Sequence, residues 1–322
     1  MRAARVMSQN PESPLDGLEI VDVPVPEPRP GWVSVDVRAS SVNPHDLWTL
    51  RGVGHPADRV PMTLGCEAAG VTSQGREVLL APVMGDADAG GGDVTMDPRR
   101  HILSERVDGG LAQKVVVPSE NLIDKPDWLS FEQAGVLAVA WGTAYRMLFT
   151  RARLRPGQRV LVQGSSGGVS SAAIALAVAA GCKVYATGRT THKREFAASL
   201  GAHGVFESGA RLPERVDVVV DTVGAATWKH SVMSVEAGGT IVTCGNTSGD
   251  PTPALMTHIF YRQLSVIGST GCTPAELRGL LSMMEATGVR PVVDAVVPLE
   301  DVRDAFARLD AGDVCGKIAV TV

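Results

Sequence analysis

Three glycines near the middle of the chain are spaced as in a turn that binds the phosphates of a dinucleotide. Gly164, Gly167 and Gly168 follow an apolar run, RVLVQG, and precede a run of small residues that suits a helix. Glycine lets the backbone approach a pyrophosphate, and the helix N-terminus places free N–H groups and a partial positive charge against it. The spacing therefore predicts a cofactor site, with a glycine-rich turn that binds no ligand as the alternative.

Ser170 stands where a third glycine is expected in such a turn. That position serves the close packing of helix on strand rather than phosphate contact, and serine is the next best size. The substitution weakens the motif without cancelling it. The residues that we expect at the phosphates are Gly164, Ser165, Ser166, Gly167, Gly168 and Val169.

The next apolar run ends in cations rather than in a carboxylate. KVYAT is followed by Gly188, Arg189, Thr190 and Lys193, and no carboxylate occurs before Glu195. An NAD site usually places Asp or Glu at this strand end to bind the ribose 2′-hydroxyl, whereas cations pair with a 2′-phosphate. We therefore expect NADPH as the cofactor; the alternative is that these charges are solvated at the start of a helix.

The composition is that of an ordinary globular protein. The 322 residues are 44% hydrophobic and 20% charged, with a net charge of −5 and no basic run, so neither a nucleic acid nor an anionic membrane is an expected partner. The N-terminal residues lack the apolar core of a signal peptide, and we expect a cytoplasmic protein. The five cysteines are scattered, which disfavours a disulfide framework or a zinc knuckle.

Two styles of sequence alternate along the chain. Up to about residue 120, short β-branched runs are separated by Pro, Gly and Asp, and the stretch 85–101 is predicted to be a surface loop. Residues 130–154 have a helical pattern. From 159 onward apolar strands alternate with helices, as in a parallel sheet covered on both faces. The last fifty residues, with a predicted helix at 274–287, return to the first style and are expected to complete the first unit.

Four segments together resemble the medium-chain dehydrogenase/reductase superfamily, in its branch of zinc-independent quinone oxidoreductases. They are SSVNPHDLWTLRG (40–52), PMTLGCEAAGV (61–71), AGVLAVAWGTAYRML (134–148) and RVLVQGSSGGV (159–169), with GKIAVTV closing the chain. The resemblance implies an α/β protein: a GroES-like β-barrel domain, residues 1–124 and 270–322, interrupted by a doubly wound parallel-sheet Rossmann domain, residues 125–269. It also implies an active site in the cleft between the domains.

The resemblance further implies that the protein holds no metal. In the zinc-dependent branch the ligands fall at the positions of Asn43, Cys66 and Val139, of which only Cys66 is a good zinc ligand. The lobe that carries four cysteines in zinc relatives has none here. His45, Asp46 and Glu67 lie close in sequence, so an improvised site is the alternative.

Without zinc, a direct alcohol oxidation loses its Lewis acid, but hydride delivery to an activated acceptor does not need one. The resemblance therefore implies an NADPH-dependent reductase of a quinone or an α,β-unsaturated carbonyl compound. Three alternatives stay open. They are a dedicated enoyl reductase of secondary metabolism, a protein that binds NADPH without turnover, and a residual zinc alcohol dehydrogenase.

The resemblance also implies which residues line the site. Asn43 matches a position beside the nicotinamide, and either His45 or His55 is a candidate general acid because imidazole titrates near neutrality. For each histidine a purely structural role is the alternative. The other residues expected at the cofactor are Thr143, Val223, Cys244, Gly245, Asn246, Gly268, Ser269, Thr270 and, at a phosphate, Lys317. The run LSVIGST suggests a homodimer, because family members often pair this strand with its copy.

Overall fold

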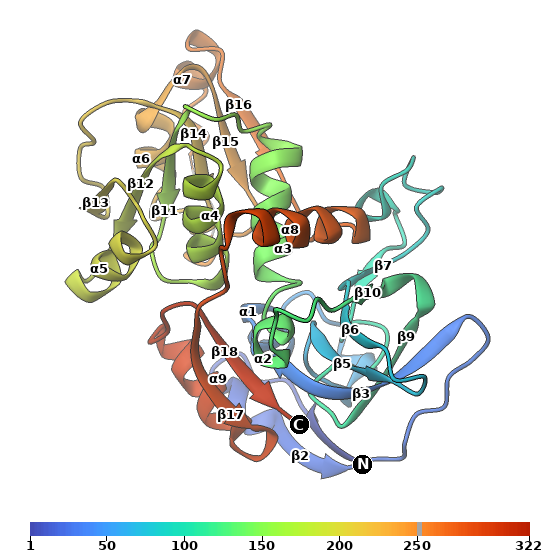
Figure 1. The fold of residues 1–322 in the computed structure, drawn as a ribbon. Coiled ribbons are helices and arrows are strands. Elements are labelled where there is room, and N and C mark those ends of the chain that lie inside the picture. Colours follow the sequence, from blue (N-terminus) through green and yellow to red (C-terminus); the bar gives the residue numbers. More distant parts are fainter. Residues whose placement is uncertain (250–252) are drawn as a thin grey trace. The chain divides into compact units, whose positions relative to one another are not determined.

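The computed structural model describes residues 1–249 and 253–322, which form two compact units. The β-rich unit comprises Met1–Val139, Gly271–Leu281 and Pro291–Val322, and it contains both termini (Figure 1). The α/β unit comprises Ala140–Thr270 and Ser282–Arg290. The observed division differs from the expected one: residues 125–139 belong to the β-rich unit, and residues 270 and 282–290 belong to the α/β unit.

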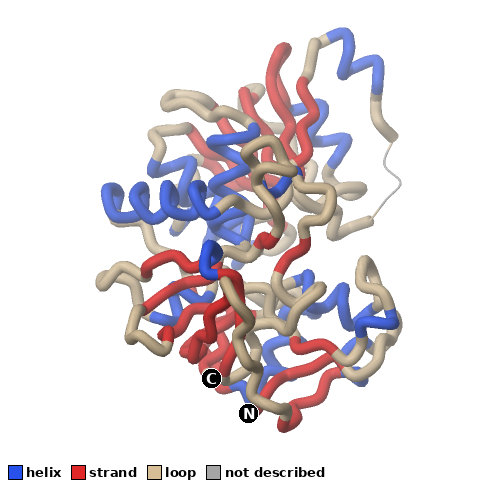
Figure 2. Tube along the Cα trace, turned by 90° about the vertical axis from the view of Figure 1, so that its right-hand side faces the viewer, coloured by secondary structure: helices blue, strands red, loops and turns tan. Residues whose placement is uncertain are grey.

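The β-rich unit is built on a seven-stranded sheet, in which strands from the two ends of the chain are neighbours. Its order is β10-β6-β5-β3-β18-β17, with β9 also paired to β3; a second sheet has the order β2-β1-β4, and β7 pairs with β8. Strands are drawn in red in Figure 2. The strands are β1 (Arg2–Val6), β2 (Leu18–Asp22), β3 (Trp32–Ser41), β4 (Met62–Thr63), β5 (Ala68–Thr72), β6 (Glu77–Leu80), β7 (Val83–Met84), β8 (His101–Ile102), β9 (Lys114–Pro118), β10 (Leu122–Asp124), β17 (Val293–Pro298) and β18 (Lys317–Thr321).

The cores of this unit explain why the C-terminal segment returns to it. One cluster packs Leu50 of α1 (Pro44–Arg51) and Leu64 against Phe306 of α9 (Val302–Ala311), so residues about 250 positions apart share a core. Burying such apolar side chains contributes about 1.5–3 kcal/mol each. The C-terminal segment therefore completes the first unit, as the sequence predicts.

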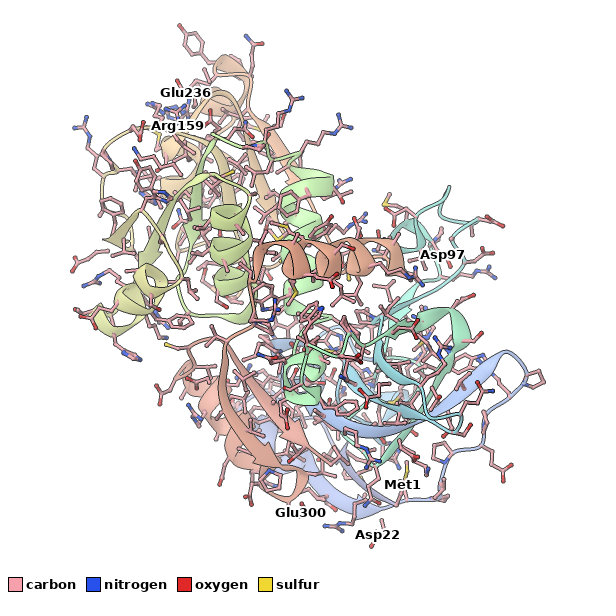
Figure 3. The ribbon with its side chains drawn as sticks, in the orientation of Figure 1. Met1, Asp22, Asp97, Arg159, Glu236 and Glu300 are labelled. Carbon is pink, nitrogen blue, oxygen red and sulfur yellow. The ribbon has the colours of Figure 1, made fainter. Side chains whose placement is uncertain are left out.

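The stretch 85–101 is largely loop, but a buried carboxylate organises it. Asp97 is 2% exposed and accepts hydrogen bonds from the N–H groups of Asp86 and Arg99 at 2.8 and 2.9 Å. These backbone donors lower the pKa of Asp97, which is labelled in Figure 3. The loop is therefore folded back on its own side chain.

The α/β unit contains the parallel sheet that the sequence predicts. Six strands pair in the order β13-β12-β11-β14-β15-β16, and every neighbouring pair is parallel. The strands are β11 (Arg159–Gln163), β12 (Lys183–Gly188), β13 (Gly204–Glu207), β14 (Val216–Asp221), β15 (Val235–Thr243) and β16 (Ser265–Gly268). The helices are α3 (Ala140–Tyr145), α4 (Gly168–Ala179), α5 (Thr191–Ser199), α6 (Trp228–Ser234) and α7 (Met256–Tyr261), while α8 (Pro274–Thr287) has residues in both units.

Three central strands of this sheet are clamped at one end by an arginine. Arg159 begins β11 and pairs with Asp217 of β14 at 3.0 Å and with Glu236 of β15 at 2.9 Å (Figure 3). The carboxylates hold the pKa of Arg159 above its ordinary value. This network lies where the strands begin, at the opposite end from the glycine turn.

The predicted helical stretch 130–154 is interrupted. Ser130 caps α2 (Phe131–Gly135) with its hydroxyl, but the next helix begins only at Ala140 and continues as a π-helix over Arg146–Arg151. Gly135 explains the close packing of α2 on β3, because a Cβ there would lie 2.8 Å from the Ala39 carbonyl carbon. The division between the two units falls in this interruption, between Val139 and Ala140.

No helix within residues 1–249 and 253–322 is both long enough and apolar enough to cross a bilayer. The cytoplasmic location expected from the sequence stays a prediction.

Candidate functional site

The glycine turn has the geometry that its sequence predicts. Gly164 has a φ of +81°, a left-handed conformation that glycine adopts without strain, and its N–H donates to Thr187 Oγ1 at 3.3 Å. Gly167 is the N-cap of α4, and a Cβ added to it would meet no atom within 4 Å. The approach to the N-terminus of α4 is therefore open to a ligand.

Ser170 fits the position of the third glycine. Its side chain is 5% exposed, and its hydroxyl donates to the Gln163 carbonyl oxygen at 3.4 Å. A Cβ on Gly164 would lie only 3.3 Å from Ser170 Oγ, so the strand and α4 are in close contact here. Serine therefore preserves the packing that a glycine would give and adds a hydrogen bond to β11.

A buried hydroxyl at the same turn has no protein partner among the described residues. Ser165 is 3% exposed, and its Oγ makes no hydrogen bond there. The atom lies 2.4 Å from where a Cβ on Gly188 would stand, so glycine at 188 makes the room for it. Because buried polar atoms are almost always paired, this oxygen is suited to a ligand group. The turn, the open N-terminus of α4 and the unpaired hydroxyl together fit the pyrophosphate of a dinucleotide.

The end of β12 carries three cations rather than the two that the sequence analysis singled out. Arg189 is exposed, and Lys193 lies in the first turn of α5, where its N–H donates to Thr190 Oγ1 at 3.3 Å. Arg194 donates to the Gly188 carbonyl oxygen at 3.0 Å. A carboxylate also lies nearby, because Glu207 of β13 is 3.6 Å from Arg194. No local sequence pattern indicates Arg194 or Glu207, since only the pairing of β12 with β13 brings them together.

The other predicted cofactor residues of the α/β unit follow the carboxyl ends of neighbouring strands. The parallel ladder sets Gln163 beside Asp221, Asp221 beside Thr243, and Thr243 beside Gly268. The turns that follow these four residues therefore share one edge of the sheet, where ligands bind in open α/β folds. They contain Val223, Cys244, Gly245, Asn246, Ser269 and Thr270.

Beneath this edge lies a buried hydrogen-bond chain that sequence analysis did not predict. Gln163 accepts from Thr187 Oγ1 at 2.7 Å and donates to Ser231 Oγ at 3.0 Å, and Ser231 donates to Asp221 at 2.6 Å. Asp221 in turn accepts from the N–H of Val223 at 2.9 Å. The chain links the glycine turn to the turn after β14, and its side chains are almost fully buried.

In the β-rich unit, Asn43 stands at the start of α1. Its N–H donates to one carboxylate oxygen of Asp46 at 3.0 Å, and the other oxygen accepts from the Gly65 N–H at 2.8 Å. Burial raises the pKa of Asp46 above its ordinary value. Asp46 therefore fixes the start of α1 against the segment that contains Gly65.

Glu67 is the centre of a buried polar cluster beside Asn43. One of its oxygens accepts from Ser41 Oγ at 2.5 Å, from Asn43 Nδ2 at 3.1 Å and from the ammonium of Lys317 at 3.1 Å. The other oxygen accepts from the Val139 N–H at 2.7 Å. Glu67 is 0% exposed and Lys317 is 5% exposed, so this is a buried ion pair with every carboxylate oxygen satisfied.

Lys317 does not have the place that the sequence suggested for it. Its ammonium also donates to Asn43 Oδ1 at 2.5 Å and to the Val42 carbonyl oxygen at 3.1 Å, so its three donors all have protein partners. The cause is the antiparallel pairing of β18 with β3, in which Ala319 faces Ser41 and which brings Lys317 opposite Asn43. Its predicted contact with a phosphate is therefore replaced by a contact with Glu67.

The three positions that match the zinc ligands of relatives do not fit a metal here. The Asn43 amide is occupied on both of its polar atoms, and Val139 contributes only a backbone N–H. Burial raises the pKa of the Cys66 thiol well above its usual range, which disfavours the thiolate that zinc binds. We therefore derive no chemical step through a metal at these positions.

A second donor set lies close by but is also poorly suited to zinc. One ligand atom each of His45, Asp46 and Cys66 lies within 4.8 Å of the others. Both oxygens of Asp46 already accept backbone hydrogen bonds, and burial favours the protonated forms of Asp46 and Cys66. Cys66 would therefore have to lose a proton inside the protein, and Asp46 would have to give up backbone hydrogen bonds, before they could bind a cation.

The two candidate acids have different surroundings. His45 Nε2 lies 3.1 Å from an oxygen of Glu105, and its side chain is 23% exposed. His55 is 5% exposed, and burial, followed by the charge of His45, lowers its pKa. No local sequence pattern indicates Glu105, which lies 60 residues from His45 and belongs to no motif.

The predicted site residues fall in both units. Asn43, His45, His55 and Lys317 belong to the β-rich unit. Thr143 is 6% exposed on α3 and belongs to the α/β unit, together with all the remaining predicted cofactor residues. Their roles at the cofactor stay predictions.

Comparison with known families matches both units. A model of the alcohol dehydrogenase GroES-like domain matches residues 29–127, and a model of the zinc-binding dehydrogenase domain matches residues 168–286. An acryloyl-coenzyme A reductase of Metallosphaera sedula is 31% identical over 95% of this chain and 96% of its own. A quinone oxidoreductase of Lama guanicoe is 28% identical over 99% and 97% of the two chains.

Solved structures of similar proteins align with this chain over all or nearly all of its length. A structure described as an NAD-dependent alcohol dehydrogenase aligns with a TM-score of 0.91 and 32% identity over 100% of both chains. The 2-octenoyl-CoA carboxylase reductase CinF, in complex with NADP and 2-octenoyl-CoA, aligns with a TM-score of 0.89 and 25% identity over 99% of this chain and 87% of its own. With its GroES-like and Rossmann parts both matched, the chain belongs to the medium-chain dehydrogenase/reductase superfamily.

Proposed function

We propose that this protein is an NADPH-dependent reductase that delivers hydride to a quinone or an α,β-unsaturated carbonyl compound and needs no zinc. The observation that carries the proposal is the buried Lys317–Glu67 pair, which engages Asn43 where zinc relatives hold the metal. A fixed ammonium at this point repels a metal cation and offers no open coordination position. Acceptors that are already activated do not need that Lewis acid.

The cofactor assignment rests on the α/β unit. NADPH, when bound, supplies the hydride. The open N-terminus of α4 and the unpaired Ser165 hydroxyl suit its pyrophosphate, and the cations Arg189 and Lys193 suit its 2′-phosphate. CinF, a relative of known structure, is complexed with NADP, which favours the same choice. The NAD-dependent relative makes the distinction worth measuring.

An enoyl thioester is the second candidate acceptor. It is favoured by the relatives named acryloyl-coenzyme A reductase and by CinF, whose structure contains 2-octenoyl-CoA. A thioester conjugated to a double bond undergoes the same hydride addition at its β-carbon as any other enone. The two proposals therefore share one chemistry and differ in the group that the protein must recognise beyond the reacting atoms.

The binding experiment is a fluorescence titration of the protein, treated with a chelator, with NADPH and then with NADH. We expect NADPH to bind at least about tenfold more tightly, because charged hydrogen bonds to a phosphate contribute about 1.5–3 kcal/mol. Equal affinity for both nucleotides would remove the 2′-phosphate assignment. Selective binding without oxidation by any quinone or enoyl thioester would favour a protein that binds NADPH without turnover.

We also infer a homodimer that pairs the exposed edge of the parallel sheet. β16 is the edge strand, and Val266 on it is 45% exposed. Phe260 and Tyr261 of the neighbouring α7 are exposed as well. An apolar edge strand is a ready template for a second copy. Light scattering should give the mass of a dimer, and Val266→Lys should reduce it to that of a monomer; a monomeric parent protein would contradict the inference.

A further inference from the structure

The side chain of Gln163 is completely buried at the carboxyl end of β11, and both of its polar atoms are hydrogen-bonded. Oε1 accepts from Thr187 Oγ1 at 2.7 Å. Nε2 has two neighbours, Ser231 Oγ at 3.0 Å and His230 Nδ1 at 2.9 Å. The amide therefore joins β11 to β12 on one side and to α6 on the other.

His230 determines which way this amide points. His230 Nε2 lies 2.9 Å from the carbonyl oxygen of Ala210, which can only accept a hydrogen bond, so Nε2 carries the hydrogen. In the neutral ring Nδ1 is then an acceptor, and it requires the NH₂ group of Gln163 rather than its oxygen. If the amide were turned over, two acceptors would face each other at this contact.

On one side, the orientation of the amide reaches the glycine turn. Because Gln163 Oε1 only accepts, Thr187 donates its hydroxyl hydrogen to it, and the lone pairs of Thr187 Oγ1 are left for the Gly164 N–H at 3.3 Å. The main-chain ladder between β11 and β12 ends at the pair Val162 and Ala186. Beyond that pair, the Thr187 hydroxyl ties Gly164 to β12.

On the other side, the same amide reaches the turn after β14. Gln163 Nε2 donates to Ser231 Oγ, so Ser231 donates its own hydrogen to Asp221, at 2.6 Å. The second oxygen of Asp221 accepts from the N–H groups of Val223 and Gly224 at 2.9 and 3.1 Å. One side-chain amide thus orients peptide groups of two turns, at the edge of the sheet where ligands bind in open α/β folds.

Polar side chains are not needed here for stability alone. When both partners of a buried hydrogen bond are replaced by apolar groups of the same shape, the folded state loses little free energy. Apolar side chains cannot orient the N–H groups of a turn, whereas a fully satisfied polar network specifies a single arrangement. The network around Gln163 is therefore suited to fixing the two turns in one conformation.

We propose that Gln163 and His230 are positioning residues for the cofactor. His230 fixes the amide of Gln163, and this amide holds the turns after β11 and β14 in the conformation that binds NADPH. The inference rests on the proposed function and deepens it, because it names residues that set the affinity for the cofactor by acting through the two turns.

The first test needs no cofactor. In protein with ¹⁵N-labelled histidine, long-range ¹H–¹⁵N spectra taken where the ring is neutral distinguish Nε2–H from Nδ1–H, and the spectrum of His230→Asn identifies the signals of His230. We expect the Nε2–H form. A ring that carries its hydrogen on Nδ1 would overturn the proposal, because Gln163 would then have to present its oxygen to it.

The second test compares two replacements of His230 by their Kd for NADPH in a fluorescence titration. Both variants lose the contact with Ala210, so they differ in the acceptor that faces Gln163. His230→Asn places an amide oxygen where Nδ1 accepts, and its Kd should stay within about threefold of the parent value. His230→Leu offers no acceptor and leaves the amide free to turn over, so its Kd should rise roughly tenfold.

A double-mutant cycle tests whether His230 acts through Gln163. Gln163→Met keeps the length of the side chain but loses its hydrogen bonds, and we expect the Kd for NADPH to rise at least about tenfold. The double variant of Gln163→Met with His230→Leu should have the Kd of Gln163→Met, because His230 then has no amide to orient. Losses that multiply in the double variant would contradict the proposed order of action.

A matched control is Tyr185→Phe in β12. It removes a hydrogen bond from a side chain that is 3% exposed to Glu214 at 2.5 Å, near where the strands begin. Its Kd for NADPH should equal that of the parent protein. A lower affinity in this variant would mean that any lost hydrogen bond in the sheet weakens binding, which would overturn the specific role of Gln163.

The outcomes separate this inference from the proposed function. If the parent protein binds NADPH and His230→Leu binds it equally well, the role of His230 is refuted while the proposed function stands. Equal losses in His230→Asn and His230→Leu would also refute it, because the contact with Ala210 would then matter instead of the acceptor. A parent protein that binds no NADPH would remove the proposed function and this inference together.

Discussion

The proposal that this protein needs no zinc depends on the buried ion pair between Lys317 and Glu67. The same pair should also contribute to the stability of the folded protein. Removing one partner leaves a charge buried without compensation, which costs about 3–5 kcal/mol. We expect Lys317→Met to lower the free energy of unfolding in urea by that amount. The double variant Lys317→Met with Glu67→Gln should recover part of the loss.

The control for that prediction is Lys114→Met, because Lys114 pairs with Asp36 on the surface, where both side chains are more than one-third exposed. Exposed pairs contribute about 0–1 kcal/mol, so its free energy of unfolding should barely change. Equal losses in Lys114→Met and Lys317→Met would contradict the account of a buried pair.

Arg189 and Lys193 carry the choice of cofactor. In the double variant Arg189→Ala with Lys193→Ala, the Kd for NADPH should rise at least about tenfold, since two charged contacts to a phosphate are removed. The Kd for NADH should stay the same. Arg211→Ala, which removes an exposed arginine between β13 and β14, is the control and should change neither constant. A parallel loss for both nucleotides would point to damage of the fold instead.

The buried ring of His55 makes the stability of the protein depend on pH. Its pKa is lowered in the folded protein, so below about pH 6.5 the unfolded chain binds more protons than the folded one. The stability that neutral His55 contributes is therefore complete above pH 6.5 and is lost as the pH falls. His101 has the same direction, again chiefly because of burial.

Urea unfolding at several pH values between 5 and 8 measures this effect. His55→Gln should flatten the decline of the unfolding free energy below pH 6.5, by at most about 1.4 kcal/mol per pH unit. The exposed His192→Gln is the control and should leave the decline as it is. An undiminished decline in His55→Gln would show that His55 is not buried as a neutral ring.

At the scale of elements, the contact between β11 and α4 decides whether the glycine turn holds its shape. Ser170→Ala keeps the small volume and loses one hydrogen bond, so we expect NADPH affinity within about threefold of the parent. Ser170→Leu forces a large side chain against Gly164 and should weaken NADPH binding more than tenfold, because overpacking displaces the helix. Tight binding by Ser170→Leu would mean that α4 does not set the phosphate site. A nucleotide titration of both variants measures this.

The sequence predicted elements well where their signals are local. The glycine turn, α4 and the parallel strands follow from periodicity and turn residues within a few positions of one another. The stretch 130–154 was predicted less well, because its interruption depends on two distant contacts. Gly135 packs on Ala39, and Val139 donates to Glu67 instead of continuing a helix.

The contacts of the buried polar residues in the β-rich unit were harder still to predict, because they depend on residues far apart in the sequence. The position of Lys317 before the last strand suggests a contact with a phosphate, yet the register of β18 on β3 places it at Glu67. Glu105 belongs to no motif and meets His45 only through the fold. No spacing rule could bring together residues that are 60 or 250 positions apart.

At the scale of the whole molecule, membership of the superfamily does not decide whether the protein needs a metal. One of the two domain models that match the chain is named for zinc binding. At the three positions where zinc would need ligands, the described residues hold a carboxamide, a thiol whose pKa burial raises, and a backbone N–H, and a buried ammonium lies beside them. Hydride transfer to an acceptor that is already activated, the reaction that we propose, does not need three such ligands.

The most direct test is NADPH oxidation by protein whose zinc content has been reduced with a chelator and measured, with 9,10-phenanthrenequinone and crotonyl-CoA as acceptors. The account predicts that at least one acceptor is reduced, at a rate that does not change when zinc is added back. A rate that appears only with added zinc, or reduction of neither acceptor, would contradict it.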